Sequence, residues 1–287
     1  MASRISIFAP AKINLYLHVT GKRADGFHLL DSLITFAEIG DHLSASPSDK
    51  LSLAIEGPFS PGLSSGPDNL VIKAAHLLAE FAGINAKATL TLTKNLPVAS
   101  GIGGGSADAA ATLHALAELW GISPAPSDLM LLAQQLGADV PVCVSGSPSF
   151  ISGIGEEINP APLLPSCWLV LINSNVAVST PDVFQQFSGN FSEPHPFETS
   201  PGSYADLIEL LTDRKNDLTQ PAITVAPIIE AVLSALEETP DLGLARLSGS
   251  GATCFGLFAN QTTAQNAAQI LAHAHPDWWV QAAALQI

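Results

Sequence analysis

The chain has 287 residues and a formal net charge of −15 at pH 7, and 47% of its residues are hydrophobic against 13% charged. This length suits two modest domains, and such a composition excludes an intrinsically disordered protein. The acidic balance argues against nucleic acid or an anionic membrane as a partner, although local cations and backbone amides suffice to bind a small anion.

The first part of the chain, up to about residue 160, predicts a mixture of strands and helices. Period-two alternation predicts strands, and apolar residues at helical spacing between a capping residue and a glycine predict helices. In chain order we expect strand segments within 5–28 on either side of Pro10 with a turn at 24–26, a hairpin over 42–57, a helix over 69–83 capped by Asp68 and a strand over 86–94. A helix capped by Ser106 and ended by Gly121, a helix over 128–137 capped by Ser127, and strands within 141–158 are expected to follow.

The second part begins after three prolines that lie between Asn159 and Trp168. Such a run indicates a junction, so we expect two domains at 1–160 and 161–287. The elements expected after it are a strand over 167–174, a loop carrying 179–184, helices over 204–211 and 226–238, two strands joined by a Gly/Ser loop within 244–259, a helix over 262–275 and an edge strand over 278–287.

The three cysteines, Cys143, Cys167 and Cys254, form no CxxC pair and are odd in number. A disulfide framework is therefore not expected, which favours a reduced, cytoplasmic protein. The sequence has no run of about eighteen apolar residues, so we expect no transmembrane helix, and the first twenty residues are typical of a strand rather than a signal peptide.

A glycine-rich loop lies between an expected strand and an expected helix, in the sequence LPVASGIGGGSADAAATL, with four glycines within 101–105. Backbone N–H groups converge easily in such a loop, and a helix N-terminus adds partial positive charge, so the segment predicts a phosphate site rather than a mere packing turn. A Walker loop is excluded, since the only Gly-Lys pair, at 21–22, lacks the preceding glycine, and a dinucleotide fingerprint is weak because Ser106 stands at its third glycine position.

The glycine loop resembles the phosphate-loop motif of the GHMP small-molecule kinases. The sequences PAKINLYLHVTGKRADGFHLLDSL, LGADVP, STPDVF, KNDL and RLSGSGATCFGLF also occur in the order of those members that phosphorylate a CDP-linked methylerythritol. The resemblance covers nearly the whole chain. It implies an α+β fold of two domains, an N-terminal ribosomal-protein-S5-like ATP domain and a C-terminal ferredoxin-like domain. It also implies transfer of the γ-phosphate of ATP, with Mg²⁺, to the 2-hydroxyl of the methylerythritol unit in the non-mevalonate isoprenoid pathway.

The resemblance implies Lys12 and Asp139 as catalytic residues. Asp139 is the expected base, although an acid at such a position is also typical of a helix cap. Lys12 lies in an apolar strand, where a lysine must reach an anion or solvent, and it would keep Asp139 ionised.

The binding residues follow from the same resemblance. The ATP set is Pro97, Val98, Ala99, Ser100, Gly101, Ile102, Gly103, Gly104, Gly105, Ser106, Ala107 and Asn69, of which Asn69 is expected near adenine. The substrate set is Asn14, Phe27, His28, Thr180 and Phe184. Phe27 and Phe184 are expected to sandwich the cytosine, His28 to meet its base edge, and Thr180 to belong to the same wall of the site. A second backbone cradle over the phosphates would come from Gly249, Ser250 and Gly251. No metal ligand is evident except Ser106.

The chain departs from the family pattern at three positions. Phe27 stands where the family commonly has Tyr, so stacking survives but a phenol hydrogen bond does not. Ala99 and Ala107 also differ, and Ser106 is left as the only hydroxyl at that helix start.

Several alternatives remain open: another GHMP kinase acting on mevalonate, homoserine or a sugar, or a nucleotide-binding module without catalysis. The segment GLSSG at 62–66 formally fits a hydrolase elbow, but Pro67 blocks the helix that should follow. His273 and His275 are interpreted as surface histidines. Apart from the small-molecule substrate we expect no nucleic-acid or membrane partner, and either a monomer or a weak homodimer.

Overall fold

The computed structural model describes residues 4–286. Within them the chain forms two compact units that interleave along the sequence. The first unit comprises residues up to 11, 39–98 and 103–146, and the second comprises 12–38, 99–102 and 147 onward. The long strands β1 (Ile5–Lys22) and β2 (His28–Ser46) therefore contribute residues to both units. The predicted domain boundary at residue 160 stays a prediction.

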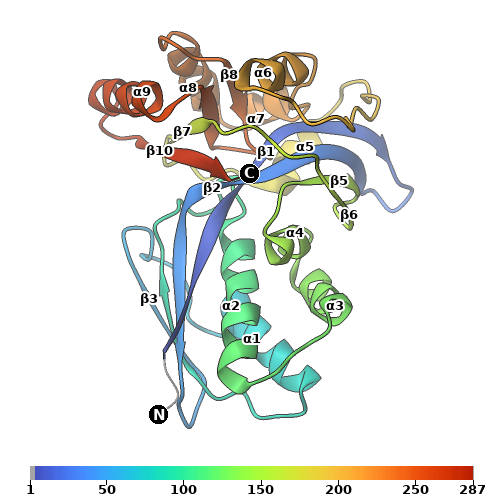
Figure 1. The fold of residues 1–287 in the computed structure, drawn as a ribbon, viewed down its shortest axis with the longest axis vertical. Helices are drawn as coiled ribbons and strands as arrows, with labels where there is room; N and C mark the ends of the chain where they lie inside the picture. The colour runs from blue at the N-terminus through green and yellow to red at the C-terminus, as the bar shows by residue number, and fades with distance from the viewer. Residues whose placement is uncertain (1–3, 287) are drawn as a thin grey trace. The chain divides into compact units, whose positions relative to one another are not determined.

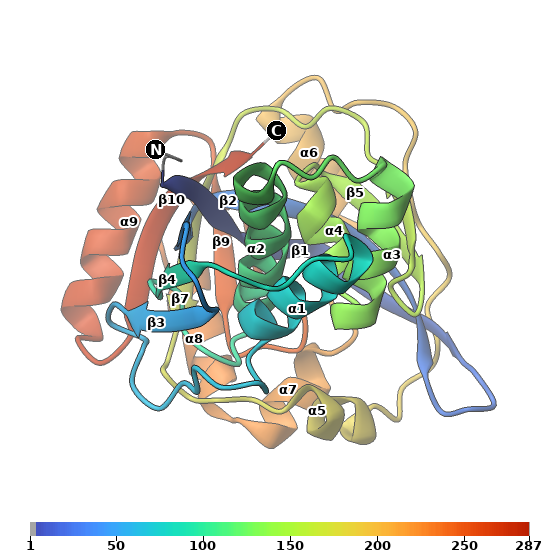
Figure 2. The ribbon, with the colours of Figure 1, turned by 90° about the horizontal axis from the view of Figure 1, so that it is seen from below.

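The first unit packs helices against a small sheet. Its elements, besides the ends of β1 and β2, are β3 (Ser52–Glu56), α1 (Leu70–Phe81), β4 (Thr89–Thr93), α2 (Gly104–Trp120), α3 (Pro126–Leu136) and α4 (Val140–Ser145). Figures 1 and 2 show α1 and α2 side by side, and their small and aliphatic side chains share one buried core with those of the strands. Alanines such as Ala109 and Ala115 let α2 pack closely in this core.

Strand β4 lies between β2 and β3, and this corrects the hairpin expected over 42–57. Leu92 pairs with Leu43 in antiparallel β2, whereas Leu90 pairs with Leu53 in parallel β3. The parallel pair is possible because α1 lies between β3 and β4 in the chain. The strand predicted over 86–94 and the helix predicted over 69–83 are confirmed.

The predicted helix caps in the first unit are wrong. Asn69, not Asp68, caps α1, because the Asn69 side chain accepts a hydrogen bond from the N–H of Val71. Helix α2 follows Gly103, a residue with φ of +64° and no side-chain cap, so Ser106 lies within the first turn. Helix α3 starts at a proline, one residue before the expected cap at Ser127, because proline suits the first position of a helix.

The second unit combines an antiparallel sheet with helices. Its elements are β5 (Ser149–Gly153), β6 (Glu157–Pro160), β7 (Trp168–Asn173), α5 (Thr180–Gln186), α6 (Tyr204–Thr212), α7 (Thr219–Val225), α8 (Ile228–Glu237), β8 (Leu244–Leu247), β9 (Cys254–Phe258), α9 (Gln261–Ala274) and β10 (Trp279–Gln286). The strand order is β2-β10-β7-β9-β8, and β5 pairs with β2 and β6. Helix α9 packs against β10 and β7 (Figure 1).

Strand β10 was expected at an edge, but it lies between β2 and β7. Leu285 pairs with Ala37 of β2, and Ala284 pairs with Trp168 of β7. Its alternating residues Ala283 and Leu285 are buried, which an edge position would not require. The strands predicted at β7, β8 and β9 and the helices predicted at α6, α8 and α9 are confirmed.

Two further segments form helices that were not predicted, and both have a proline in the first turn. Residues 140–145 form α4 instead of a strand, and Thr180–Gln186 forms α5 instead of a loop. Ser179 caps α5 by accepting from the N–H of Asp182, and a proline occupies its first turn. Helix α7 was not expected at all.

Pro10 does not break β1, which continues across it. A side-chain carbon on Gly40 of β2 would lie 2.2 Å from the carbonyl oxygen of Ala9, so the two strands approach here too closely for any other residue. Glycine at position 40 therefore allows the close approach of β2 to residues Ala9 and Pro10 of β1. Among residues 4–286, no helix is long and apolar enough to cross a membrane.

Candidate active site

The glycine loop is joined to the loop between β8 and β9 within the second unit. Ser248 Oγ donates a 3.1 Å hydrogen bond to the carbonyl of Gly101 and accepts one of 3.2 Å from the N–H of Asn14. The N–H of Thr253 donates to the carbonyl of Ser100 at 3.0 Å. These bonds bring together two loops that were both predicted to surround phosphates, and Ser248 is a contact residue that the sequence analysis missed.

Glycine is required where the two loops meet. Gly101 has φ of +75°, and a Cβ there would lie 2.4 Å from the carbonyl oxygen of Ser248 and 2.8 Å from the nitrogen of Gly251. Gly249 has φ of +56°, and its Cβ would lie 2.9 Å from the carbonyl oxygen of Gly101. Ala99 adopts a similar left-handed φ of +50° without being glycine. The two loops thus pack backbone against backbone, which only glycine allows at these two positions.

The glycine loop ends at the N-terminus of α2. Gly103 precedes the helix in a left-handed conformation, and its carbonyl accepts the hydrogen bond from the N–H of Ala107. The N–H groups of Gly104, Gly105 and Ser106 belong to the first turn, where no intrahelical acceptor exists. This turn is therefore suited to hold an anion.

Polar side chains of Asn14, Thr180 and Ser250 lie beside this junction. Asn14 is buried, and its Nδ2 donates to Ser32 Oγ at 2.8 Å. Its Oδ1 is buried without a hydrogen-bond partner among the described residues and lies 3.4 Å from the position a Cβ on Gly249 would take. Thr180 Oγ1 and Ser250 Oγ are hydrogen-bonded at 2.8 Å. A buried acceptor without a donor fits a ligand that brings a hydroxyl or amine.

An aromatic cluster in the second unit contains two of the residues predicted to bind the base. The rings of His28 and Phe184 stack at a centroid distance of 5.0 Å with 20° between their planes, and Phe187 meets His28 edge-on at 5.7 Å. Burial, and secondarily the charge of Lys22, lowers the pKa of His28, so its imidazole is neutral at pH 7 and offers one donor and one acceptor. Phe27 is 59% exposed.

Lys12 and Asp139 lie in different units, Lys12 in the second and Asp139 in the first. Lys12 is buried in β1, and its N–H donates to the carbonyl of Ile102 at 2.9 Å, directly beside the glycine loop. Asp139 immediately precedes α4, yet its side chain makes no capping bond to that helix. The simple capping role, which the sequence left open for Asp139, is therefore not supported.

Asn69, predicted to lie near adenine, uses its amide within the first unit. Its Oδ1 accepts from the N–H of Val71 at 2.9 Å, and its Nδ2 donates to the carbonyl of Ser64 at 2.7 Å. Both ends of the amide thus hold the start of α1. Its contact with ATP stays a prediction.

A buried charged cluster beneath the N-terminus of α2 was not anticipated. It consists of Lys94, Asp41 and Asp108, which form two ion pairs through the lysine. Burial lowers the pKa of Lys94, but the charges of Asp108 and Asp41 outweigh burial and raise it. Burial raises the pKa of Asp108 to about 7. The available sequence signals were a lysine at a strand end and an acid in an alanine-rich helix.

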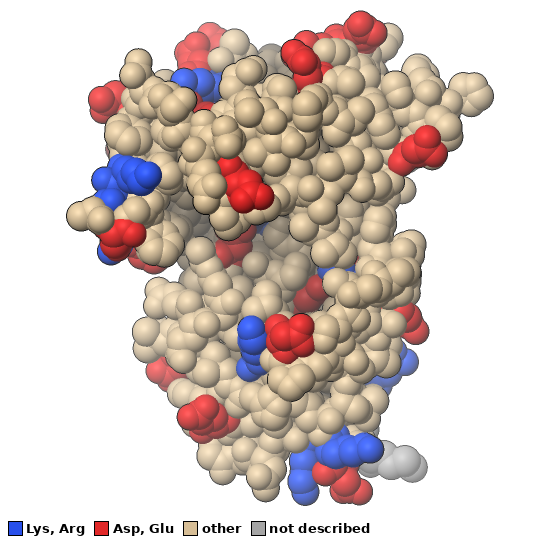
Figure 3. Space-filling view, turned by 180° about the vertical axis from the view of Figure 1, so that it is seen from behind, with Lys and Arg blue, Asp and Glu red and all other residues tan. Residues whose placement is uncertain are grey.

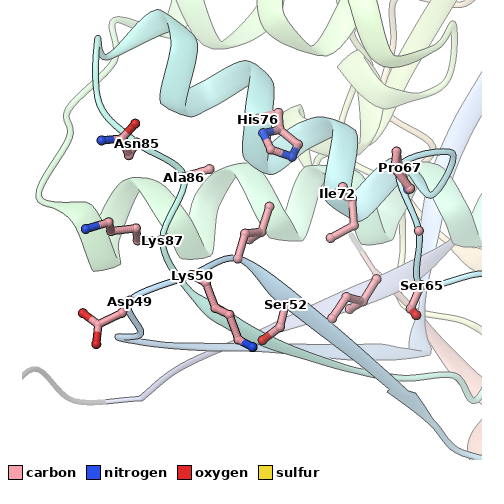
Figure 4. A pocket seen from close by; sticks show the side chains of 13 residues that line it. Asp49, Lys50, Ser52, Ser65, Pro67, Ile72, His76, Asn85, Ala86 and Lys87 are labelled. Atoms are coloured by element: carbon pink, nitrogen blue, oxygen red, sulfur yellow. The ribbon is translucent and has the colours of Figure 1, made fainter.

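A cavity of about 510 Å³ lies elsewhere in the first unit, beside β3 and α1 (Figure 4). Its lining includes Lys50, His76 and Lys87, but none of the predicted site residues. On the face drawn in Figure 3, charged side chains of the described residues are scattered over a largely uncharged surface. Within residues 4–286, no group of three or more His, Cys, Asp and Glu side chains could hold a metal ion.

A phosphate-type loop at a helix N-terminus, joined to a second glycine loop in an α+β fold, defines the class of protein. The model of the GHMP kinase N-terminal domain matches residues 69–147, and that of the GHMP kinase C-terminal domain matches 198–277. The chain belongs to the GHMP kinase family, so the predicted family and its α+β fold are confirmed.

Particular relatives are more informative than the family. The chain is 52% identical to a protein of Paramagnetospirillum magneticum, over 98% of either chain, and 53% identical to one of Ruegeria pomeroyi, over 96% of this chain and 97% of that one. Both are named 4-diphosphocytidyl-2-C-methyl-D-erythritol kinase. A solved structure of 4-(cytidine 5'-diphospho)-2C-methyl-D-erythritol kinase is 31% identical, with a TM-score of 0.81 over 99% of this chain and 100% of that one.

Homoserine kinase from Cytophaga hutchinsonii shares the fold at a TM-score of 0.76, over 100% of this chain and 96% of that one. At 18% identity, this similarity shows a common fold and nothing about the substrate.

Proposed function

We propose that this protein transfers the γ-phosphoryl group of ATP to the 2-hydroxyl of 4-diphosphocytidyl-2-C-methyl-D-erythritol, a step of the non-mevalonate isoprenoid pathway. The observation that carries the proposal is the junction of the two glycine loops, with Asn14 and Thr180 beside it. Relatives of about half identity over nearly the full chain support this particular substrate.

ATP is bound chiefly by backbone in this proposal. The segment from Pro97 to Ala107 holds the phosphates with its N–H groups, and Gly249, Ser250 and Gly251 close the second side. Backbone donors suit a phosphoryl transfer, since that reaction needs positioning and charge neutralisation more than covalent help from the protein. Mg²⁺ bound with ATP would neutralise phosphate charge, and the hydroxyl of Ser106 is the side chain that would hold it.

The proton moves from the substrate hydroxyl to the carboxylate of Asp139. The resulting oxygen forms a bond to the γ-phosphorus while the bond from that phosphorus to the leaving ADP oxygen breaks. The ammonium of Lys12 stabilises the negative charge that develops on the attacking oxygen. The place of Lys12 supports this role, because it is buried in β1 and its backbone N–H bonds to Ile102 in the glycine loop.

The cytosine is bound by the aromatic cluster. Phe184 supplies a flat face, Phe27 the opposite one, and neutral His28 offers a donor and an acceptor to the base edge. Thr180 contributes its hydroxyl to the same wall, and Asn14 offers its unpartnered Oδ1 to a hydroxyl of the methylerythritol unit.

The proposal includes a cytoplasmic location, a small-molecule partner without nucleic acid or membrane, and a monomer or weak homodimer. Its domains are an ATP-binding domain at 1–160 and a C-terminal domain at 161–287.

A coupled ADP-release assay tests the function. ATP, Mg²⁺ and the CDP-linked substrate are compared with mevalonate, homoserine and galactose at equal concentrations. We expect turnover with the CDP-linked alcohol alone. Preference for another alcohol would assign a different GHMP kinase activity, and binding of ATP without any turnover would reduce the protein to a nucleotide-binding module.

A further inference from the structure

Lys94 is a buried cation with two carboxylate partners in the first unit. Its Nζ donates to Asp41 and, at 2.7 Å, to Oδ2 of Asp108. The exposed fractions of Lys94, Asp41 and Asp108 are 4%, 0% and 3%. Such a cluster gains little stability over apolar side chains of the same volume, because removing three charges from water is costly. What it does provide is a fixed geometry.

The two carboxylates connect Lys94 to opposite ends of the glycine loop. Asp41 Oδ1 accepts hydrogen bonds of 2.6 Å from the N–H of Asn95 and 2.9 Å from the N–H of Leu96, the residues that lead into the loop. Asp108 lies in α2, just after the loop ends. One ammonium group therefore links the backbone that enters the loop to the helix that leaves it.

The ammonium lies close to the first residue of α2. A Cβ built on Gly104 would be 3.4 Å from Lys94 Nζ and 3.6 Å from Asp41 Oδ2. The backbone of Lys94 is also fixed, since its N–H donates to the carbonyl of Glu56 at 2.7 Å. The cluster thus supports the turn whose N–H groups are proposed to bind phosphate.

We propose that Lys94 is a positioning residue that holds the start of the glycine loop against the N-terminus of α2, and so preforms the phosphate site for ATP. This inference rests on the proposed use of the loop for ATP. Lys94 touches no substrate and acts through Asp41 and Asp108.

The net charge of the cluster offers a competing explanation for any loss of ATP affinity in a Lys94 variant. Above pH 7, where Asp108 is ionised, two carboxylates and one ammonium carry a formal charge of −1, and loss of the lysine leaves −2 beneath an anion site. Lys94→Met removes both the link and the charge, whereas Lys94→Met combined with Asp108→Asn restores −1 without the link. Asp108→Asn alone keeps an oxygen that can accept from the ammonium.

The test measures the Kd of ATP by calorimetry on the full chain, without the alcohol substrate, and then the KM values of both substrates. Lys94→Met is expected to weaken ATP binding by about 10-fold to 100-fold, because misplaced binding groups lose that much. The KM of the alcohol should change by less than about twofold, and the double variant should stay as weak as Lys94→Met. Asp108→Asn should weaken ATP binding less than Lys94→Met or the double variant does. Lys94→Arg should bind ATP more tightly than Lys94→Met, because it keeps a cation. Lys73→Met, at an exposed lysine on α1, is the matched control.

The inference is overturned if Lys94→Met lowers the melting temperature yet binds ATP like the wild type, or if the double variant regains wild-type affinity. Lys94→Gln replaces Lys94→Met if the methionine variant does not fold, since it removes the charge and spans only one carboxylate. Failure of the wild-type protein to bind ATP would instead overturn the proposed function, and this inference with it.

Discussion

Ser248 and Gly101 lie 147 positions apart in the chain, yet the hydroxyl of Ser248 donates a 3.1 Å hydrogen bond to the Gly101 carbonyl. The contact joins a glycine loop before α2 to the loop between β8 and β9. The two loops therefore form one backbone surface, and a change in either is expected to disturb both.

Gly101→Ala should destabilise the protein, because its Cβ would lie 2.4 Å from the Ser248 carbonyl oxygen at a φ of +75°. Strain and overpacking together predict a loss of about 2 to 4 kcal/mol in the free energy of unfolding. Ala99→Gly is the matched control at φ of +50°, where relief of strain offsets added chain entropy to within about 1 kcal/mol. Urea unfolding measures both, and a stable Gly101→Ala would show that the loops separate easily.

The sequence predicted the glycine loop and its partner loop because both carry their chemistry in local residue types. It did not predict that Ser248 joins them, since the contact depends on how β8 and β9 lie against β1. The buried cluster of Lys94, Asp41 and Asp108 was missed for the same reason: three residues far apart in the chain meet only after folding.

Element types were predicted well where periodicity was strong, as in β4 and α9. The errors arose where strand pairing decides the neighbours of a strand, or where a capping residue decides the start of a helix. The hairpin over 42–57 was wrong because β4 pairs with both flanking strands, and the predicted cap Ser106 lies inside α2 because Gly103 already starts the helix. Helix α5 was missed although Ser179 and a proline mark its start.

Asp139→Asn should fold normally and lose most turnover, because the acceptor for the substrate proton is gone. A general base is worth about a hundredfold to ten-thousandfold in kcat, so a fall of that size is expected at unchanged ATP affinity. Asp49→Asn, at an exposed carboxylate of the same unit, is the control. Steady-state kinetics with circular dichroism would decide, and wild-type turnover would remove Asp139 from the mechanism.

Phe184→Leu keeps an apolar side chain but removes the ring that stacks on His28 at 5.0 Å. Loss of a stacking face is worth about 1 to 3 kcal/mol, so the KM of the CDP-linked substrate should rise by about 5-fold to 150-fold. The KM of ATP should not change. Phe81→Leu, at a 46% exposed ring on α1, should leave both constants alone. Equal rises in both KM values for Phe184→Leu would indicate general damage rather than a base-binding role.

The KM of the CDP-linked substrate should be flat from pH 6.5 to 8 and should rise below this range. Burial, followed by the charge of Lys22, lowers the pKa of His28 below its ordinary 6.5, so protonation and loss of its acceptor begin only in more acidic solution. Kinetics at saturating ATP across pH 5 to 8 measure the effect, and His28→Phe should abolish the acidic rise. A profile that is the same in the variant would exclude His28 as its source.

The stabilisation of the wild type relative to Asp108→Asn should decline as pH rises from about 4 to 7. Burial raises the pKa of Asp108 from 3.8 to about 7, so in this window the folded protein keeps a proton that the unfolded chain has released. Where the folded protein binds more protons than the unfolded chain, the free energy of unfolding falls as pH rises. Above pH 7 the stabilisation that comes from the Asp108 proton is gone. Asparagine has no such titration. Melting temperatures of both proteins from pH 4.5 to 8 give the difference, and a gap that did not narrow with pH would show that Asp108 is ionised throughout.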